Sequence, residues 1–502
     1  MRSKNAVYNI ISSVVLQCII ILFGLIVPRI IISEYGSSVN GLISSITQFL
    51  AFVTLLEAGF GPMIKSILYK PIATQDKTCI AKILKTSDKI FKNISYIFIV
   101  YIVLLCCIMP FVVINEFDIF FTISLIVIIA ISIFAEYYWG MTYRLFLQAE
   151  QKTYVVSIIQ TLTLVLNILV IWILVYYKAN IQIVKLASSL IFVLRPILQN
   201  MYVKKKYDID FKNVDGDYKI NQKWDGLAQH IAYVIHSNVD IVILTLYGSL
   251  AEVSVYSVYY MVIEGVKNVV KSFVKGLDAT FGDMIAKDEK SILNKSFKVY
   301  EQLYFSVTTI VFGSTLILIN SFIKIYTNGI NDANYIRPTF AILMVIAELI
   351  NLIRQPYNDL VKVAGHFKQT QIGAWFEAIS NIVISFILVW KFGIIGVAIG
   401  TIFAMFVRTV EFVCYTSKHI LERSLWYSIK WLGTIVTEVI IISIIMNFIS
   451  KFEVYNYATW ILNAVEVVGI SAFVVCTINL LIHKESSIYI LTYLKNKRSN
   501  NR

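Results

Sequence analysis

The chain has 502 residues, of which 58% are hydrophobic and 15% are charged, whereas a soluble globular chain carries roughly 25% charged residues. This surplus of apolar residues excludes a water-soluble protein and, because apolar runs recur along the whole chain, also a single core with one membrane anchor. The formal net charge is +13. The basic residues fall mainly in loops predicted to lie on one membrane face, where anionic lipid attracts them. The positive charge therefore does not indicate a nucleic-acid partner, and we expect none.

Runs of about 20 apolar residues are long enough to cross a bilayer, and fourteen such runs follow one another with short gaps. No small-residue cleavage site follows the first run, so we expect a retained helix there and not a signal peptide. In chain order, the predicted spans cover 8–32, 41–64, 93–113, 119–142, 154–177, 181–203, 227–247, 252–275, 299–321, 336–360, 370–390, 394–416, 428–449 and 458–482. The sequence therefore predicts an all-α, polytopic membrane protein.

Lysine and arginine are distributed unequally between the predicted loops. With a cytoplasmic N-terminus, the loops on the cytoplasmic side hold 31 of these residues and the external loops hold four. Because loops rich in Lys and Arg stay on the cytoplasmic side, this bias predicts a multi-pass protein of the cell membrane with both termini in the cytoplasm. It also favours an even number of helices, since one missed helix would disrupt the alternation.

Two stretches of the chain share an order of residues. The first has Tyr35-Gly36-Ser37 and later Phe60-Gly61-Pro62-Met63-Ile64, and the second has Tyr247-Gly248-Ser249 and later Phe281-Gly282-Asp283-Met284-Ile285. Further along, Asn167, Lys178 and Arg195 correspond to Asn381, Lys391 and Arg408. Because equivalent helices are six apart, both halves have the same orientation, as in a transporter built from parallel repeats with a site between its lobes.

This repeat predicts four segments. They are a six-helix lobe at 1–203, a cytoplasmic linker at 204–225, a second, pseudo-symmetric six-helix lobe at 226–417, and two additional transmembrane helices with a cytoplasmic tail at 418–502. The polar and charged composition of 204–225 suits a solvated linker. The last two helices have no counterpart in the repeat, so we expect them at the periphery.

Ionisable residues within the predicted spans mark candidate sites, because each costs at least about 2.5–3.5 kcal/mol at the bilayer centre. Glu264, Lys267, Lys271 and Lys275 recur at steps of three, four and four, so they share one helical face. This row favours a basic groove for an anion. The alternative is that Lys271 and Lys275 extend to the cytoplasmic surface.

Other charged residues complete the set of candidates. Arg29 near the end of the first span and Arg354 in the tenth join Lys267 and Lys271 as candidate substrate-binding cations, and the candidate coupling or lumen acids are Glu57, Glu136, Asp240 and Glu264. Arg408 and Glu411 are three residues apart and are expected to pair on one helix. The histidines lack metal-ligand spacing, so we predict neither a metal site nor a cofactor.

The chain resembles the polysaccharide flippases of the Wzx type, in the superfamily that also includes the multidrug and toxic-compound extrusion (MATE) transporters and the lipid II flippases. The resemblance covers essentially the whole chain. It is carried by Asn9-Ile10 to Pro28-Arg29, Tyr35-Gly36 to Asn40-Gly41-Leu42, Glu57-Ala58-Gly59-Phe60-Gly61, and Arg144 to Gln148-Ala149-Glu150-Gln151-Lys152.

This resemblance implies a MATE-like, V-shaped bundle of two lobes that moves an undecaprenyl-pyrophosphate-linked oligosaccharide, a repeat unit of O-antigen, capsule or a similar surface polysaccharide, from the inner to the outer leaflet by alternating access. A pyrophosphate group requires cations, which Arg29, Lys267, Lys271 and Arg354 would supply. Membrane lipid, Na⁺ or H⁺ as coupling ions, and polysaccharide polymerases are the further partners that this function suggests.

Three other functions compete with this one. A cation-coupled multidrug or organic-cation antiporter of the same fold would use lumen carboxylates such as Glu57, Glu136 and Asp240. An enzyme such as a glycan polymerase is disfavoured because the loops are short and carry no DxD, HExxH or GxSxG motif, so we expect no enzymatic activity. A scaffold role in envelope assembly remains an alternative.

Overall fold

The computed structural model describes residues 2–57, 59–207, 216, 218, 227–273, 277–449, 455–484 and 487. This part of the chain is helical and contains no β-strand, and thirteen of its helices are long and apolar enough to cross a membrane. The all-α, multi-pass prediction is therefore confirmed. Most of the predicted linker 204–225, Lys275, Ala58 and the tail beyond 487 lie outside the described residues.

One predicted span, 252–275, is not among the thirteen. It corresponds to α11 (Leu250–Ser272), a helix of 23 residues that is long enough to cross the hydrocarbon core. Glu264, Lys267 and Lys271 interrupt its apolar sequence. The predicted number of about fourteen thus exceeds the thirteen apolar helices by one charged helix.

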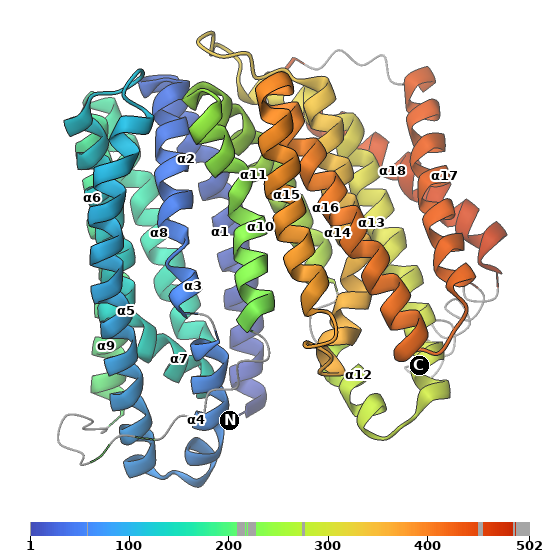
Figure 1. The fold of residues 1–502 in the computed structure, drawn as a ribbon, viewed down its shortest axis with the longest axis horizontal. Helices are drawn as coiled ribbons and strands as arrows, with labels where there is room; N and C mark the ends of the chain where they lie inside the picture. The colour runs from blue at the N-terminus through green and yellow to red at the C-terminus, as the bar shows by residue number, and fades with distance from the viewer. Residues whose placement is uncertain are drawn as a thin grey trace. The chain divides into compact units, whose positions relative to one another are not determined.

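The structure divides into two compact units, Met1–Ser257 and Val258–Arg502, and Figure 1 shows the helices of each unit side by side. The first unit holds α1 (Arg2–Tyr35), α2 (Ser37–Ala51), α3 (Thr54–Glu57), α4 (Phe60–Thr74), α5 (Lys77–Val112), α6 (Ile119–Ala135), the π-helix η1 (Glu136–Gly140), α7 (Met141–Ala149), α8 (Thr153–Tyr176), α9 (Ile181–Lys206), α10 (Leu227–Tyr247) and the first part of α11.

The second unit begins within α11. It continues with α12 (Leu277–Ala286), α13 (Lys290–Tyr326), α14 (Pro338–Val363), α15 (Gln371–Phe392), α16 (Ile394–His419), α17 (Leu425–Ile449) and α18 (Tyr457–Ile482). Helices α14, α15 and α16 pack closely together, and α18 packs against both α13 and α17. The predicted lobe boundary at 204–225 stays a prediction.

The element order repeats along the chain. The predicted span 41–64 is divided into α2, α3 and α4. Gly59, directly before α4, takes a left-handed conformation with φ of 83°, which glycine adopts without steric cost. The helix that follows, α5, has 36 residues. In the second half, α11 and α12 are likewise followed by a long helix, α13, of 37 residues. At 1.5 Å per residue, α5 and α13 reach about 54 Å and extend well beyond a bilayer core.

The outer faces of the helices are apolar. Only 11% of an apolar stretch of 18 residues in α1 is buried within the protein. In each of the thirteen candidate spans, the buried share of such a stretch is at most 56%. Ile10, Leu162, Phe386 and Leu462 are among the large side chains exposed there. Lipid chains cover such surfaces in a membrane, so each unit presents apolar side chains to the bilayer and keeps its polar groups inside.

Candidate functional site

Lys267 on α11 is held between two carboxylates. Its Nζ atom pairs with Glu264 on the same helix and lies 3.2 Å from Oε1 of Glu348 on α14. Lys267 is 6% exposed, so its charge is removed from solvent and depends on these partners. The predicted basic row is therefore interleaved with acidic groups.

Helix α14 extends these contacts along one face. Glu348, Asn351 and Arg354 follow at steps of three and so lie on the same side of the helix. Asn351 Nδ2 donates to Glu348 Oε2 at 2.8 Å, and Arg354 Nη2 donates to Asn351 Oδ1 at 2.8 Å. The asparagine thus links the carboxylate that binds Lys267 with the guanidinium of Arg354.

Helices α15 and α16 complete the series. Arg354 Nη1 lies 2.5 Å from Glu377 Oε1, and the other oxygen of Glu377 lies 3.6 Å from Arg408 Nε. Arg408 also pairs with Glu411 at 2.5 Å, which confirms the predicted pair, and donates to the Thr370 carbonyl at 2.7 Å. One continuous set of polar contacts therefore crosses four helices of the second unit.

We call this set the α14 network. It consists of Glu264, Lys267, Lys271, Glu348, Asn351, Arg354, Glu377, Arg408 and Glu411. Lys271 has no carboxylate within ion-pair distance among the described residues, but it interacts electrostatically with Lys267, Glu264, Glu348 and Arg354. With four basic and four acidic members, the α14 network is formally neutral.

The acids of the α14 network differ in exposure. The Glu264 and Glu411 side chains are 33% and 30% exposed, whereas their partners Lys267 and Arg408 are 8% and 4% exposed. These two carboxylates are thus more exposed than the cations with which they pair, whereas Glu348 and Glu377 are as buried as Lys267 and Arg354. Lys267 and Arg408 would become available to a ligand if an exposed carboxylate moved away.

The first unit holds a smaller charged cluster around η1. Tyr137 donates to Glu57 Oε2 at 2.9 Å, and Arg144 Nη1 lies 2.9 Å from Glu136 Oε1. Arg195 on α9 interacts electrostatically with Glu136 and Arg144. The π-helical turn, a feature often found at functional sites, begins at Glu136 and includes Tyr137. We call Glu57, Glu136, Tyr137, Arg144 and Arg195 the η1 cluster.

The remaining candidates lie elsewhere in the first unit. Asp240 on α10 is 6% exposed and accepts a hydrogen bond from Tyr256 at 2.8 Å. Arg29 lies on α1, directly after Pro28, and is partly buried. Of the four predicted cations, Lys267, Lys271 and Arg354 therefore come together in one unit and Arg29 belongs to the other.

Glu348 and Asn351 belong to the α14 network but are not among the residues predicted from the sequence. Their spacing from Arg354 in steps of three on one predicted helix was the available signal. The partner of Glu348 is Lys267, which is 81 residues away in the chain, so the pairing itself has no local signal.

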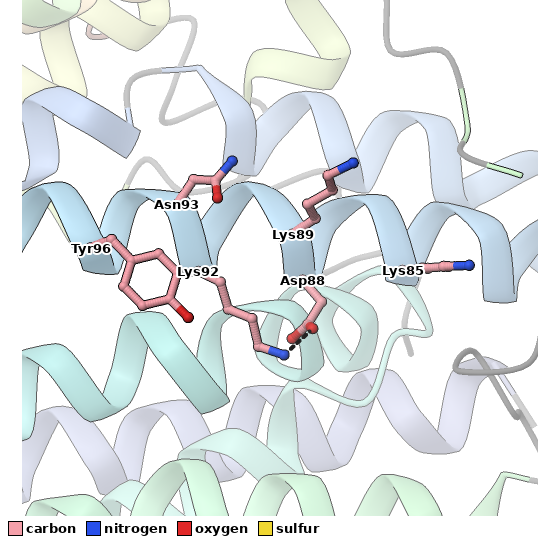
Figure 2. A pocket seen from close by; sticks show the side chains of 6 residues that line it. All are labelled: Lys85, Asp88, Lys89, Lys92, Asn93 and Tyr96. Atoms are coloured by element: carbon pink, nitrogen blue, oxygen red, sulfur yellow. Dashed lines mark ion pairs between the residues drawn. The ribbon is translucent and has the colours of Figure 1, made fainter.

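A pocket lined mainly by basic side chains lies on α5, outside the α14 network and the η1 cluster. Figure 2 shows its lining side chains, Lys85, Asp88, Lys89, Lys92, Asn93 and Tyr96. Lys92 pairs with Asp88 at 2.7 Å and lies over the Tyr138 ring, 5.4 Å from its centre. With three lysines and one aspartate, the lining has a net positive charge.

No family model and no curated protein matches this chain, but solved structures do. The lipid II flippase MurJ in an inward closed conformation matches with a TM-score of 0.68 and 14% identity over 94% of this chain and 99% of that chain. An inward-facing multidrug resistance MATE family transporter of the MOP superfamily matches with a TM-score of 0.64 and 13% identity over 80% and 94% of the two chains.

A third match is a MOP superfamily transporter from Pyrococcus furiosus, described as having a binding pocket of reversed polarity. Its TM-score is 0.53 and its identity 12%, over 84% of this chain and 97% of that one. At such identities the likeness concerns the fold. The chain has the fold that the lipid II flippase MurJ shares with the MATE transporters of the MOP superfamily.

Proposed function

We propose that this protein is a transporter that flips an undecaprenyl-pyrophosphate-linked oligosaccharide, a repeat unit of O-antigen, capsule or a similar surface polysaccharide, from the inner to the outer leaflet by alternating access. The observation that carries the proposal is the extent of the structural match. The lipid II flippase aligns with 94% of the chain, whereas two MATE structures, the inward-facing one and one in a bent conformation, align with 80% and 87%. The likeness to a flippase of a lipid-linked substrate thus includes more of this chain.

The α14 network supports an anionic substrate. A pyrophosphate needs charge-assisted hydrogen bonds from several cations, and Lys267, Lys271 and Arg354 lie close enough to interact with common partners. In the resting protein the glutamates neutralise these cations. A substrate phosphate would replace Glu264, the most exposed acid, as the partner of Lys267, while the lipid tail stays in the bilayer. Arg29 is the fourth cation of this proposal.

A charge-balanced variant tests the role of Lys267. Lys267→Gln alone leaves Glu348 without its cation and disturbs folding, so Lys267→Gln/Glu348→Gln is the informative variant, since it removes one base and one acid. We expect the purified double variant to fold, but to move a fluorescent undecaprenyl-pyrophosphate-linked oligosaccharide across proteoliposomes at least about tenfold more slowly, the loss of about 1.4 kcal/mol of binding.

The matched control is Lys287→Gln/Asp283→Gln, which removes an exposed pair with a distance of 2.7 Å outside the α14 network. We expect this variant to transport at the normal rate. Normal transport by Lys267→Gln/Glu348→Gln or by Arg29→Gln, with the protein at normal levels, would contradict their roles as substrate-binding cations. A wild-type protein that does not move the labelled lipid at all would refute the flippase function.

The second candidate is a cation-coupled multidrug or organic-cation antiporter. One observation favours it: the carboxylates of Glu264 and Glu411 are more exposed than the cations with which they pair, and an exposed carboxylate suits a cationic substrate. Glu57, Glu136 and Asp240 are the acids of the first unit that would serve such a function. Drug susceptibility in a host that lacks its own pumps separates the two candidates, because only an antiporter would raise resistance.

We further propose that the chain lies in the cytoplasmic membrane with both termini in the cytoplasm, and that 204–225 joins two six-helix lobes. The unequal distribution of Lys and Arg supports this orientation. Cysteine-accessibility labelling from either side of the membrane tests it, and an external terminus would refute it. Genes for glycosyltransferases and a polysaccharide polymerase beside this one would support a role in surface polysaccharide synthesis.

A further inference from the structure

Helices α13, α17 and α18 pack together in the second unit around an apolar cluster that includes Leu318, Ile442 and Val467. Glu438 lies one helical turn from Ile442 on the same face of α17, and only 1% of its surface is exposed. A carboxylate that is ionised at such a place costs many kcal/mol unless a cation accompanies it. The charge state of Glu438 is therefore a structural question.

One polar side chain on a neighbouring helix lies close to Glu438. Thr309 on α13 is the side chain whose hydroxyl faces its carboxyl group. Within the described residues, neither Glu438 Oε1 nor Thr309 Oγ1 has a hydrogen-bond partner that satisfies the usual geometry, and both are buried. The Thr309 hydroxyl can donate its own proton towards this carboxyl group, but one neutral donor compensates an ionised carboxylate much less than a cation does. A carboxyl group that carries its own proton avoids this cost.

The charged and titratable groups on the neighbouring helices are directed elsewhere. On α13, Glu301 pairs with Arg423, and on α16, Arg408 pairs with Glu411. Lys430 lies two turns from Glu438 on α17, about 12 Å along the axis, and donates to the Ile482 carbonyl at 3.0 Å. Among the described residues, no cation lies within ion-pair distance of Glu438.

A chain of polar groups leads from Glu438 towards one end of α17. Thr434 is one turn away on the same face, and its Oγ1 atom lies 3.0 Å from Nε2 of His483, which follows α18. Because Thr434 Oγ1 donates to the Lys430 carbonyl at 2.9 Å, His483 Nε2 is the donor in this contact. Thr434 and His483 thus lie between Glu438 and the end of α17 near which Lys430 lies.

We propose that Glu438 is a proton-binding site, which holds its carboxyl group neutral in the resting protein and exchanges the proton with water at the Lys430 end of α17. The exchange is the simple dissociation of one proton from the carboxyl oxygen to water, and its reversal. A metal ion is a poorer ligand for this place, since no group of three or more acidic, histidine or cysteine residues is gathered in the described part of the chain. This inference does not depend on which substrate the protein moves.

Infrared spectroscopy of the full chain in lipid vesicles tests the proposal directly. A protonated carboxyl group has a carbonyl stretching band that an ionised one lacks. We expect wild-type protein at neutral pH to show such a band, Glu438→Gln to lose it, and Glu466→Gln to retain it. Glu466 is a matched control, because it is a carboxyl group on the neighbouring helix α18 that is partly exposed and not buried.

Three results would overturn the proposal. The first is a wild-type spectrum without the band, which would mean that Glu438 is ionised. The second is a band that survives in Glu438→Gln, which would assign it to another residue. The third is a band that appears only when Na⁺ is removed, which would identify Glu438 as a metal-ion ligand and not a proton site.

Thermal stability gives a second readout that also reports whether the variant folds. If folding requires Glu438 to bind a proton, the wild type loses stability relative to Glu438→Gln as the pH rises above the range in which an unfolded glutamate ionises. We expect the two melting temperatures to be similar at low pH and to diverge in favour of Glu438→Gln at higher pH. Parallel pH profiles would contradict the proposal even if both proteins fold.

Discussion

Arg195 Nε on α9 donates a hydrogen bond to Thr163 Oγ1 on α8 at 2.8 Å. The corresponding arginine of the second half, Arg408 on α16, has its Nε atom 3.6 Å from Glu377 on α15. Thr163 and Glu377 each lie four residues before the repeated asparagines, Asn167 and Asn381. The two halves therefore place an arginine against the same position of the preceding helix, with a hydroxyl group in one and a carboxylate in the other.

The first half has Thr163 at the equivalent position, but we nevertheless expect Glu377→Thr to destabilise the protein. Arg408 keeps Glu411 and the Thr370 carbonyl, but Arg354 loses the carboxylate with which it pairs, and both side chains of that pair are about nine-tenths buried. Breaking a buried pair costs about 3–5 kcal/mol. We expect Glu377→Thr to have a clearly lower melting temperature in detergent. The variant Arg354→Gln/Glu377→Gln, which removes both charges of the pair, should recover part of this loss.

The pair of Lys267 and Glu348 predicts strong coupling in a double-mutant cycle. Lys267→Gln leaves the buried Glu348 without its cation, and Glu348→Gln leaves the buried Lys267 with Glu264 alone, whereas the double variant removes both charges of the pair. We expect each single change to lower stability by about 3 kcal/mol and the double change to cost less than the sum of both. Additive losses, measured by thermal unfolding, would show that the two residues do not interact.

Most of the helical arrangement could be predicted from the sequence, since a bilayer requires long apolar helices. The predicted spans 154–177 and 394–416 closely match α8 and α16. Helix ends are harder to predict: the span predicted at 93–113 begins at Lys77 in α5, because hydropathy does not detect a charged helical extension. The break at Gly59 depends on backbone conformation, which an apolar run does not indicate.

The candidate site could be predicted only in part. Arg408 and Glu411 are three residues apart, so their pairing follows from helix geometry alone. The partners of Lys267, Arg354 and Arg408 on other helices depend on how α11, α14, α15 and α16 pack, which local spacing does not determine. For this reason the lysine row was interpreted as a basic groove, although Lys267 is neutralised by Glu264 and Glu348.

Gly41 predicts a site where a single methyl group disrupts packing. A Cβ atom at this position of α2 would lie 1.7 Å from the Leu250 carbonyl oxygen at the start of α11, so the two backbones would have to separate. We expect Gly41→Ala to lower the melting temperature markedly. Gly433→Ala on α17 is the control, because its Cβ meets nothing within 4 Å and alanine favours helix by about 1 kcal/mol; it should be neutral or stabilising.

His483 predicts a loss of stability on acidification. Burial, and secondly the charge of Lys430, lower the pKa of this imidazole from 6.5 to about 4. The unfolded chain therefore binds a proton at a higher pH than the folded protein, and stability falls as the pH drops through the interval between these values. We expect His483→Phe to flatten the melting temperature in this range, whereas His419→Phe, which changes an exposed histidine, should not.

Arg423 predicts that the loop between α16 and α17 depends on one buried ion pair. Its Nη1 and Nη2 atoms lie 2.7 and 2.5 Å from the two carboxylate oxygens of Glu301, which is fully buried on α13. The guanidinium also lies 4.6 Å from the centre of the Tyr427 ring. Burial alone would lower the pKa of Arg423, but its hydrogen bonds to Glu301 and the charge of that residue raise it, so the arginine stays charged.

Lysine cannot replace this arginine, because an ammonium group lacks the planar pair of donors that matches both carboxylate oxygens. We expect Arg423→Lys to lower stability by about 2 kcal/mol and Arg423→Ala to lower it by about 3–5 kcal/mol, since the latter leaves Glu301 buried without a cation. Arg423→Met combined with Glu301→Gln removes both charges and should recover most of the loss. If Arg423→Lys instead melts like the wild type, the bidentate geometry contributes nothing and charge alone holds this loop against α13.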